Sequence, residues 1–357
     1  MEAKKTYKIL TILLIMQWAF IGIISQYPSV IEKYYSNGLY IYISKFLRLL
    51  FGWIPFSVGD IFYFLIIIIF IRFIYFAIKY KKVQLKSSFF KFGAFISIVF
   101  FLFHINWGLN YFRQPLYKTL HFEKNSYTSN ELLDFTKKLI VKTNEAQIAI
   151  TKNDTIVVEN PSNKWKIKEF SPIAYNQLQV KYPQFKFEKT SVKHSLFSLP
   201  LTYMGFAGYL NPITNEAQVN SLIPKNSYPT TVCYELAHQI GIASESEASF
   251  LGYLASVNSN NAYFNYSGYL LALRFCLSDI YQTDPEIFDV LKETINKGVL
   301  KDIQQNQDFW DSYQNWSEKY FKFFYDNFLK ANKQKEGMRE YNKLVSLLVN
   351  YHKKEKL

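Results

Sequence analysis

The hydrophobic pattern divides the chain into an apolar first third and a mixed remainder. Three almost uncharged runs cover about residues 7–25, 58–78 and 90–108. Each run is close to the roughly 17–25 residues that a helix needs to cross the hydrocarbon core of a bilayer. The pattern therefore predicts a membrane domain over residues 1–108 with three transmembrane helices.

The interruptions and flanks of these runs fit helices that stay in the membrane. Arg72 lies inside the second run, about two turns from Lys79, and its long side chain can snorkel toward that end of the helix. Three lysines lie before or at the start of the first run, as in a signal peptide, but residues 25–27 (SQY) provide no small-x-small cleavage site. We therefore expect the first run to remain as an anchor.

The connection between the first two runs, residues 26–60, contains a second kind of helical pattern. Apolar residues recur there at helical spacing, with basic residues on the other face: Ile43, Phe46, Leu47, Leu50 and Phe51 against Lys45 and Arg48. Such a pattern predicts either a helix lying in the membrane surface or a helix packed against the spans.

The distribution of charge orients the membrane domain. The net charge is +13, and the first 108 residues carry 12 of the 41 Lys and Arg but only 3 of the 28 Asp and Glu. Five lysines crowd the link between the second and third runs, and basic loops stay cytoplasmic. We therefore expect a multi-pass protein of the cytoplasmic (inner) membrane, with a cytoplasmic N-terminus and an extracytoplasmic C-terminal domain. The bilayer thus accounts for the basic excess, which excludes nucleic acid as the partner.

Residues 109–357 have the composition of a globular domain. The 49% hydrophobic content of the chain argues against disorder, and two cysteines exclude a disulfide scaffold. The expected elements are a helix over Ser129–Gln147, a hairpin over Ile148–Glu159, a helix over Pro172–Val180, short strands over 186–224, and helices over Thr230–Tyr351 with breaks near Gly241, 258–261, 283–285 and 335–337. This order predicts an α+β fold that is helix-rich in its C-terminal half.

One segment of this domain carries candidate chemistry. Glu235 and His238 are three positions apart on a predicted helix, and Tyr234 stands where an H-E-x-x-H motif has its first histidine. In that motif two histidines on one helix face hold a zinc ion, and the glutamate acts as general base for the bound water. A phenol with an ordinary pKa of about 10 is a poor substitute ligand. An ordinary helix face without metal also explains an isolated E-x-x-H.

The residues that follow predict a second helix folded back on the first. Gly241 can end the first helix in the left-handed conformation, and Ser244 can cap the next helix in a capping box with Glu247. That box favours a helix-capping role for Glu247, which is the alternative metal ligand, and leaves Glu245 free to point at the first helix as a further ligand. Helix capping and surface exposure alone also explain both glutamates.

The whole segment resembles the core motif of the bacterial membrane-protein family called domain of unknown function 3810. The family pattern is approximately H-E-x-A-H-Q-x-G-x-A-x-E-x-E-A-N-F, and residues 234–250 read YELAHQIGIASESEASF. Other places also resemble the family: PFSVGD at 55–60, WGLNY at 107–111, GYLNP and EAQVN within 208–220, and Gly337, Tyr341, Leu347 and Leu348 near the end. The family has no established activity.

The resemblance implies a zincin-like metallopeptidase domain, in which Glu235 matches the general base and His238 and Glu245 match metal ligands. Tyr234 occupies the missing first-ligand position, so two of the three ligands of a catalytic zinc remain and zinc binding stays open. His194 is the one spare histidine of the presumed strand region and is the alternative source of a ligand. Cys233 and Cys276 are expected to be free thiols in apolar surroundings.

Two functions follow from this pattern. The first is a membrane-anchored zinc metallopeptidase, impaired by Tyr234; the alternative is a pseudoenzyme that binds a peptide or a cell-envelope partner without cutting it. The stretch 208–220 is either an edge strand that holds such a peptide by β-augmentation or an ordinary sheet strand. Lys193 and Arg274 could each contact a substrate carboxylate, but we expect both at the solvated surface. A transporter is disfavoured, because the spans lack paired charges.

Overall fold

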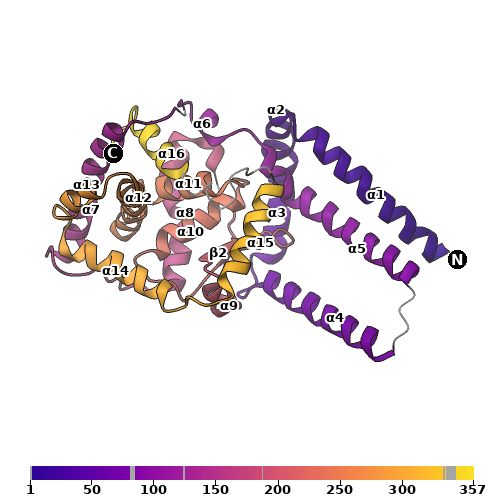
Figure 1. Cartoon of the computed structure of the whole chain (residues 1–357). Coiled ribbons are helices and arrows are strands. Elements are labelled where there is room, and N and C mark those ends of the chain that lie inside the picture. Colours follow the sequence, from indigo (N-terminus) through magenta and orange to yellow (C-terminus); the bar gives the residue numbers. More distant parts are fainter. Residues whose placement is uncertain (1, 81–84, 124, 187, 333, 335–342) are drawn as a thin grey trace.

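Three long helices project from one side of a helical body in the computed structural model, which describes residues 2–80, 85–123, 125–186, 188–332, 334 and 343–357 (Figure 1). These helices contain apolar stretches long enough to cross a membrane, at Lys5–Ile24, Val58–Phe76 and Ser88–Asn106. The prediction of three membrane-length helices is therefore confirmed.

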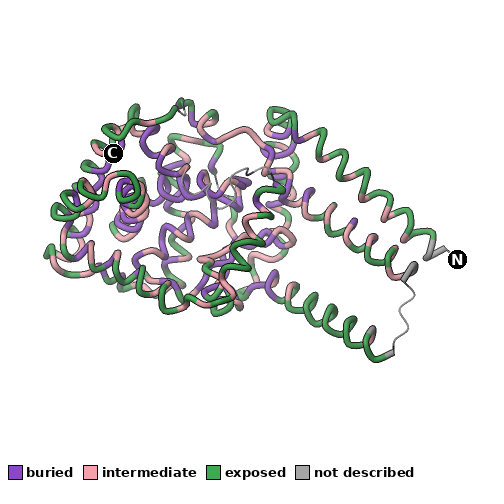
Figure 2. The backbone as a smooth tube through the Cα atoms, viewed as in Figure 1, coloured by how far each residue is buried: buried purple, intermediate pink, exposed green. Residues whose placement is uncertain are grey.

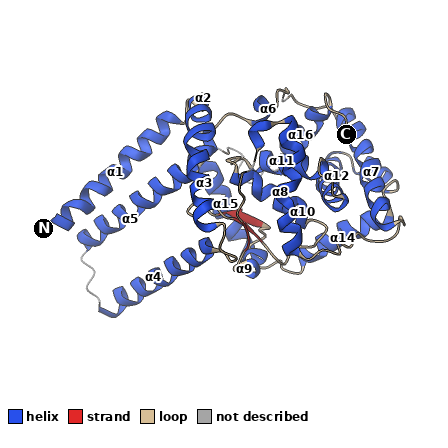
Figure 3. Ribbon diagram, turned by 180° about the vertical axis from the view of Figure 1, so that it is seen from behind, coloured by secondary structure: helices blue, strands red, loops and turns tan. Residues whose placement is uncertain are grey.

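The three helices differ in how they pack. The first, α1 (Glu2–Ile24), lies beside the third, α5 (Leu85–Asn106), whereas the second, α4 (Val58–Tyr80), stands apart from both in Figures 1 and 3. In Figure 2 most of α4 is exposed, and the buried residues gather in the body. An exposed apolar helix of this length is compatible with anchoring in a bilayer.

The remaining elements are mostly short or medium helices. They are α2 (Pro28–Val30), the π-helical η1 (Ile31–Leu39), α3 (Tyr40–Phe51), η2 (Gly108–Phe112), α6 (Leu116–Thr119), α7 (Ser129–Thr151), α8 (Lys164–Lys181), η3 (Pro183–Phe185), β1 (Val192–His194), α9 (Ser198–Tyr203), β2 (Gly208–Leu210), β3 (Ala217–Val219), α10 (Tyr228–Gln239), α11 (Glu245–Val257), α12 (Ala262–Thr283), α13 (Pro285–Lys292), α14 (Lys297–Asp311), α15 (Glu318–Ala331) and α16 (Lys343–His352). The described part of the chain after residue 108 is thus largely helical, and its strands lie within the region 186–224, where short strands are predicted.

The predicted hairpin over Ile148–Glu159 is wrong. Helix α7 continues through its first β-rich run to Thr151, and Lys152 ends the helix in the left-handed conformation. The chain then folds back along the helix, because the Gln147 amide donates hydrogen bonds to the carbonyls of Asn153 and Ile156, each at 2.7 Å. Tertiary hydrogen bonding overrides the local β propensity here. The predicted break at residues 335–337 lies outside the described residues.

The sheet has three short strands in the order β1-β3-β2. β1 pairs with β3 in parallel, with Val192 opposite Ala217, and β2 pairs with β3 antiparallel, with Gly208 opposite Val219. All three residues of β3 are buried, as expected of a central strand. β2 forms one edge of the sheet and lies near α15 (Figure 1).

Helix α3 packs on the body through its polar face. The Arg48 guanidinium is buried and donates to the Asn215 side chain at 2.9 Å. The Tyr40 hydroxyl donates to the carbonyl of Gln239 at 3.0 Å and accepts from Asn215 at 2.9 Å. On the other face Phe46 is 63% exposed. Arg48 is therefore a structural contact, and the apolar face points outward, as a helix in the membrane surface would require.

Candidate functional site

Helices α10 and α11 form the scaffold of the site. α10 ends at Gln239, and Gly241 adopts a φ of +89°, which confirms the predicted left-handed turn. α11 then begins at Glu245 and runs back against α10. The two backbones approach closely at Gly252, where a Cβ would lie 2.8 Å from the Tyr234 nitrogen. This glycine brings Tyr234, on α10, within reach of Glu245 at the start of α11.

The Glu245 carboxylate is the centre of the site. It is 2% exposed and accepts hydrogen bonds from two tyrosines, Tyr234 at Oε2 and Tyr325 at Oε1, the latter at 2.7 Å. His238 Nε2 lies 3.6 Å from Oε2. Burial raises the pKa of Glu245, but the His238 charge and the hydrogen bonds outweigh it and hold the pKa below its ordinary value. We refer to Tyr234, Glu235, His238, Glu245 and Tyr325 as the motif cluster.

The orientation of His238 is set by the turn that follows α10. Its Nδ1 lies 2.7 Å from the carbonyl oxygen of Ile242, which can only accept, so Nδ1 carries a proton and Nε2 faces Glu245. The ring packs edge-on against Tyr234, with centroids 4.7 Å apart, and against Trp107. Burial lowers the pKa of His238, yet the Glu245 charge outweighs burial and raises the pKa above its ordinary value. The pair is thus a buried imidazole–carboxylate contact.

Glu235 is buried beside this pair, and its carboxyl group has no hydrogen-bond partner among the described residues. The side chain is 0% exposed. Burial therefore raises the pKa of Glu235 to about 8. Its carboxyl group lies against β2 at Gly208, where a Cβ would overlap Glu235 Oε1 and the carbonyl of Gln218. The absence of a side chain at position 208 creates the space that Glu235 fills.

The donor set falls short of a catalytic zinc site. A catalytic zinc takes three protein ligands, with Zn–N and Zn–O distances of about 2.0–2.2 Å. His238 and Glu245 approach one another as the sequence predicts, but the first-ligand position holds a phenol that donates its hydrogen to Glu245. Among the described residues no group of three or more His, Cys, Asp and Glu side chains is arranged to hold a metal ion. We therefore derive no step that passes through a metal.

Two residues near the motif have different contacts from those that the sequence suggests. The Ser244 side chain makes no capping hydrogen bond, so the predicted capping box is absent. Glu247 instead accepts a hydrogen bond from the backbone nitrogen of Leu116 at 2.8 Å, which ties the start of α6 to α11. Glu247 therefore has a structural contact of a different kind from the one predicted.

Residues outside α10, the helix that carries the motif, have surroundings that differ in part from those predicted. His194, the alternative ligand, packs its ring against Trp165 and Tyr228. Lys193 is buried and donates to the carbonyls of Gly52 and Ile54, so its predicted exposure is wrong. Cys233 and Cys276 are free and buried, as predicted.

Tyr325 is the member of the cluster that the sequence did not reveal. It comes from α15, 80 residues after Glu245, and its ring packs edge-on against Phe206 with centroids 5.0 Å apart. No spacing rule links the two positions, because the contact depends on how α15 folds over the motif helices. In Figure 1, α15 lies between the body and the projecting helices.

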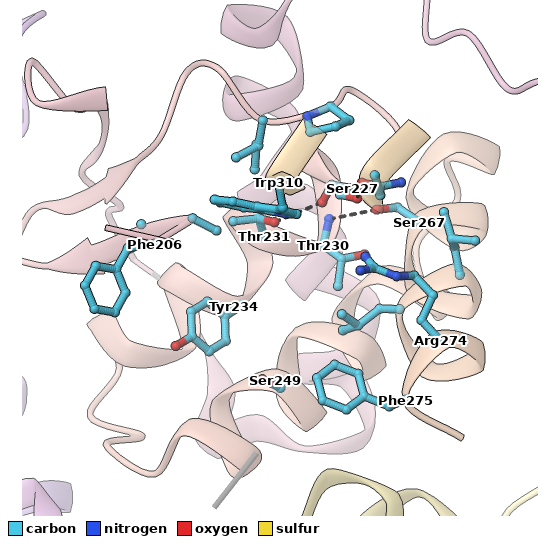
Figure 4. Close-up of a pocket in the computed structure, with 18 of the residues that line it drawn as sticks. Phe206, Ser227, Thr230, Thr231, Tyr234, Ser249, Ser267, Arg274, Phe275 and Trp310 are labelled. Carbon is cyan, nitrogen blue, oxygen red and sulfur yellow. Dashed lines mark hydrogen bonds between the residues drawn. The ribbon is translucent and has the colours of Figure 1, made fainter. Parts of the chain in front are cut away.

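A cavity of about 280 Å³ opens beside the cluster. Tyr234 and Tyr325 border it at one side, and β2 borders it through Gly208. Its walls are mainly apolar, formed by Phe206, Ile223, Leu270, Leu271, Phe275 and Trp310. Figure 4 shows Arg274 reaching from α12 toward Thr230 across this space. Arg274 is half-buried there, so the expectation of a solvated surface residue is wrong.

Among known proteins, this chain matches one family. No curated protein matches the chain, and no solved structure matches it. The model of one protein family, described as "Protein of unknown function (DUF3810)", matches residues 35–349. That match includes the motif cluster, β2 and two of the three membrane-length helices. The chain therefore belongs to the DUF3810 family.

Proposed function

We propose that this chain is a membrane-anchored, zincin-like pseudoenzyme: a domain held outside the cytoplasm that binds an extended peptide segment of a cell-envelope partner without cutting it. The observation that carries the proposal is the hydrogen bonding of Glu245. Both carboxylate oxygens of Glu245 accept hydrogen bonds from tyrosine hydroxyls, so the group that would bind a metal is already satisfied by protein donors.

The protonation of the cluster supports the same conclusion. A general base must be ionised at the working pH to take a proton from water. The raised pKa of Glu235, about 8, keeps its carboxyl group mainly protonated near neutral pH. A protonated carboxyl group does not take up a proton, so in this state Glu235 does not act as the general base that its place in the motif suggests.

The neighbouring surface supports binding. β2 is an edge strand of the sheet, with residues of intermediate exposure, and it borders the cavity. A peptide that adds to such an edge gains main-chain hydrogen bonds from the strand, and side-chain pockets beside it supply specificity. The cavity is close to the lower end of the roughly 300–1,000 Å³ range of small-ligand sites. It suits one or two side chains rather than a folded domain.

The second function, an impaired zinc metallopeptidase, is favoured by one observation. The Glu235 carboxyl group is buried without a hydrogen-bond partner among the described residues, as expected of a group that awaits a water molecule or a metal-bound ligand. The phenol at position 234 weighs against it, because the remaining ligands are fewer than a catalytic zinc requires.

Metal analysis of the full-length protein in detergent tests the two functions. We expect the natural chain to hold no stoichiometric zinc after incubation with the metal and desalting, and to leave a fluorogenic peptide mixture intact. The variant Tyr234→His, which restores the histidine pair, is expected to gain about one zinc. Tyr234→Phe is the matched control, because it removes the same hydroxyl without adding a ligand, and it should stay free of zinc.

The possible outcomes separate the proposals. Stoichiometric zinc in the natural chain, with peptide hydrolysis that Glu235→Gln abolishes, contradicts the pseudoenzyme and supports the peptidase. Absence of zinc even in Tyr234→His contradicts the zincin-like assignment itself, since both histidines and Glu245 are then present. Zinc in Tyr234→His alone supports the proposal.

A further inference from the structure

The cavity beside the motif cluster contains a cation without an anion. Arg274 is the one charged residue among the described residues that line it. No hydrogen bond or ion pair of its guanidinium occurs within the described part of the chain, and burial alone lowers its pKa. Because a guanidinium carries five N–H donors and stays charged at all ordinary pH values, leaving it unpaired beside apolar walls is costly.

A second group without a hydrogen-bond partner in the described structure, the Thr230 hydroxyl, lies near the Arg274 guanidinium. The hydroxyl is buried, and the Thr230 backbone nitrogen donates to Ser267 Oγ at 3.2 Å. Figure 4 shows the Arg274 guanidinium directed from α12 toward Thr230 on α10. Arg274 also borders a separate surface hollow, but its charged end points into the cavity in this view. Two donors therefore converge on one space.

The chemistry of these donors selects an anion. A carboxylate has two acceptor oxygens that match the guanidinium fork, and a hydroxyl donor can bind one of the same oxygens. The apolar walls next to the donors, including Leu270, Phe275 and Trp310, suit a hydrocarbon or aromatic group attached to that carboxylate. A highly charged ligand such as a polyphosphate is disfavoured, because Arg274 is the one cation that the described lining of the cavity supplies.

We propose that the Arg274 cavity binds the C-terminal carboxylate and apolar last side chain of a peptide. The inference rests on the proposed peptide-binding function and names the end of the peptide that the site recognises. A chain that lies along β2 reaches the cavity directly, since Phe206, Ala207 and Gly208 belong to its lining. The terminal carboxylate pairs with Arg274 and Thr230, and the last side chain occupies the apolar part of the cavity.

The test uses full-length protein in detergent and measures binding of labelled pentapeptides by fluorescence anisotropy. One peptide is tetra-alanine extended by leucine, with the fluorophore on its N-terminus and a free C-terminal carboxylate, and its partner is the same labelled peptide with a C-terminal amide. Decanoate serves as a third probe, because it presents the same carboxylate and apolar tail without a peptide backbone. We expect the free-acid peptide to bind at least about tenfold more tightly than the amide, as one lost charge-assisted hydrogen-bond pair predicts.

Variants assign the effect to the cavity. Arg274→Gln is expected to weaken the free-acid peptide about tenfold and leave the amide unchanged, and Arg274→Lys is expected to restore part of the affinity. Thr230→Val removes the unsatisfied hydroxyl at nearly constant volume, so it keeps the proposal testable if the arginine variants fail to fold. The matched control is Lys292→Gln, which removes a positive charge from an exposed residue beside the separate hollow. It should leave both affinities unchanged.

Each result bears on the proposal in a defined way. Equal binding of acid and amide overturns recognition of the carboxylate while the proposed peptide-binding function survives. Binding of decanoate but not of either peptide overturns the peptide as ligand. Binding of none of the three probes at millimolar concentration overturns the inference and weakens the proposed function with it. Cleavage of the peptide contradicts the pseudoenzyme, whatever the effect of Arg274→Gln.

Discussion

The Tyr234 hydroxyl donates a hydrogen bond to the Glu245 carboxylate, so a residue on α10 is bonded directly to the first residue of α11. This contact joins the two helices at the position where a zincin motif would place a metal ion between them. Under the proposed zincin-like assignment, the tyrosine stands at the position of the first histidine. It links the same two helices by a charge-assisted hydrogen bond.

The first prediction concerns the strength of this link. Tyr234→Phe removes the hydroxyl and leaves the buried Glu245 with one tyrosine donor fewer, so we expect a loss of about 1.5–3 kcal/mol in the free energy of unfolding. The measurement is the thermal midpoint of the full-length protein in detergent. Tyr320→Phe is the control, because that ring is 58% exposed on α15. Equal midpoints for the two variants contradict a stabilising role for the Tyr234–Glu245 contact.

The second prediction is a pH dependence caused by Glu235. Its pKa is about 8 in the folded protein against 4.5 for an ordinary glutamic acid. Between these values the unfolded chain releases a proton that the folded chain keeps, so stability falls as pH rises from about 4.5 to about 8. Glu235→Gln keeps the shape and removes the titration. We expect this variant to be more stable than the natural chain near pH 7, on the order of 2 kcal/mol.

Thermal midpoints measured between pH 5 and pH 9 test this expectation. The difference between the natural chain and Glu235→Gln should widen as pH rises. The control is Glu286→Gln, a change of the same type at an exposed position in the first turn of α13. If Glu235→Gln follows the natural chain in parallel across the pH range, Glu235 does not carry the raised pKa.

The turn between α10 and α11 and the approach of Glu245 to His238 were predictable from the sequence, because both depend on residues close together in the chain. Gly241 can adopt a positive φ without strain, so the turn between α10 and α11 follows from one residue type. The approach of Glu245 to His238 then follows from the spacing. The contact of Tyr325 with Glu245 spans 80 residues and depends on the tertiary position of α15, about which local patterns carry no information.

The errors in the fold have the same origin. The β-branched residues Ile148 and Ile150 suggested a strand, but α7 continues through them to Thr151. Lys193 suggested a solvated position and Arg48 the polar face of a membrane-surface helix. Both are buried, and both donate hydrogen bonds between residues 40–54 and the body. A charge on an amphipathic pattern indicates a polar environment, and a protein surface can supply that environment as well as water can.

The third prediction concerns the space around Glu235. Gly208→Ala places a methyl group into the Glu235 carboxyl group and the Gln218 carbonyl. Since the backbone oxygen cannot move without disturbing the pairing of β2 with β3, we expect a loss of about 2–4 kcal/mol in the free energy of unfolding. The control is Gly22→Ala in α1, where a Cβ meets no atom within 4 Å. The measurement is the thermal midpoint of both variants. An unchanged midpoint for Gly208→Ala contradicts the close approach of Gly208 to the Glu235 carboxyl group and the Gln218 carbonyl.

The fourth prediction tests the attachment of α3 to the motif helix. Tyr40 is 1% exposed, and its hydroxyl both donates to the Gln239 carbonyl at the end of α10 and accepts from Asn215. Tyr40→Phe leaves the Asn215 amide in a buried site without this acceptor, at an expected cost of about 1–3 kcal/mol. Tyr42 lies two residues away on the same helix and is 74% exposed, so Tyr42→Phe is a matched control. A lower thermal midpoint for Tyr40→Phe alone means that α3 stabilises the end of the motif helix. Equal midpoints mean that α3 and α10 are energetically independent.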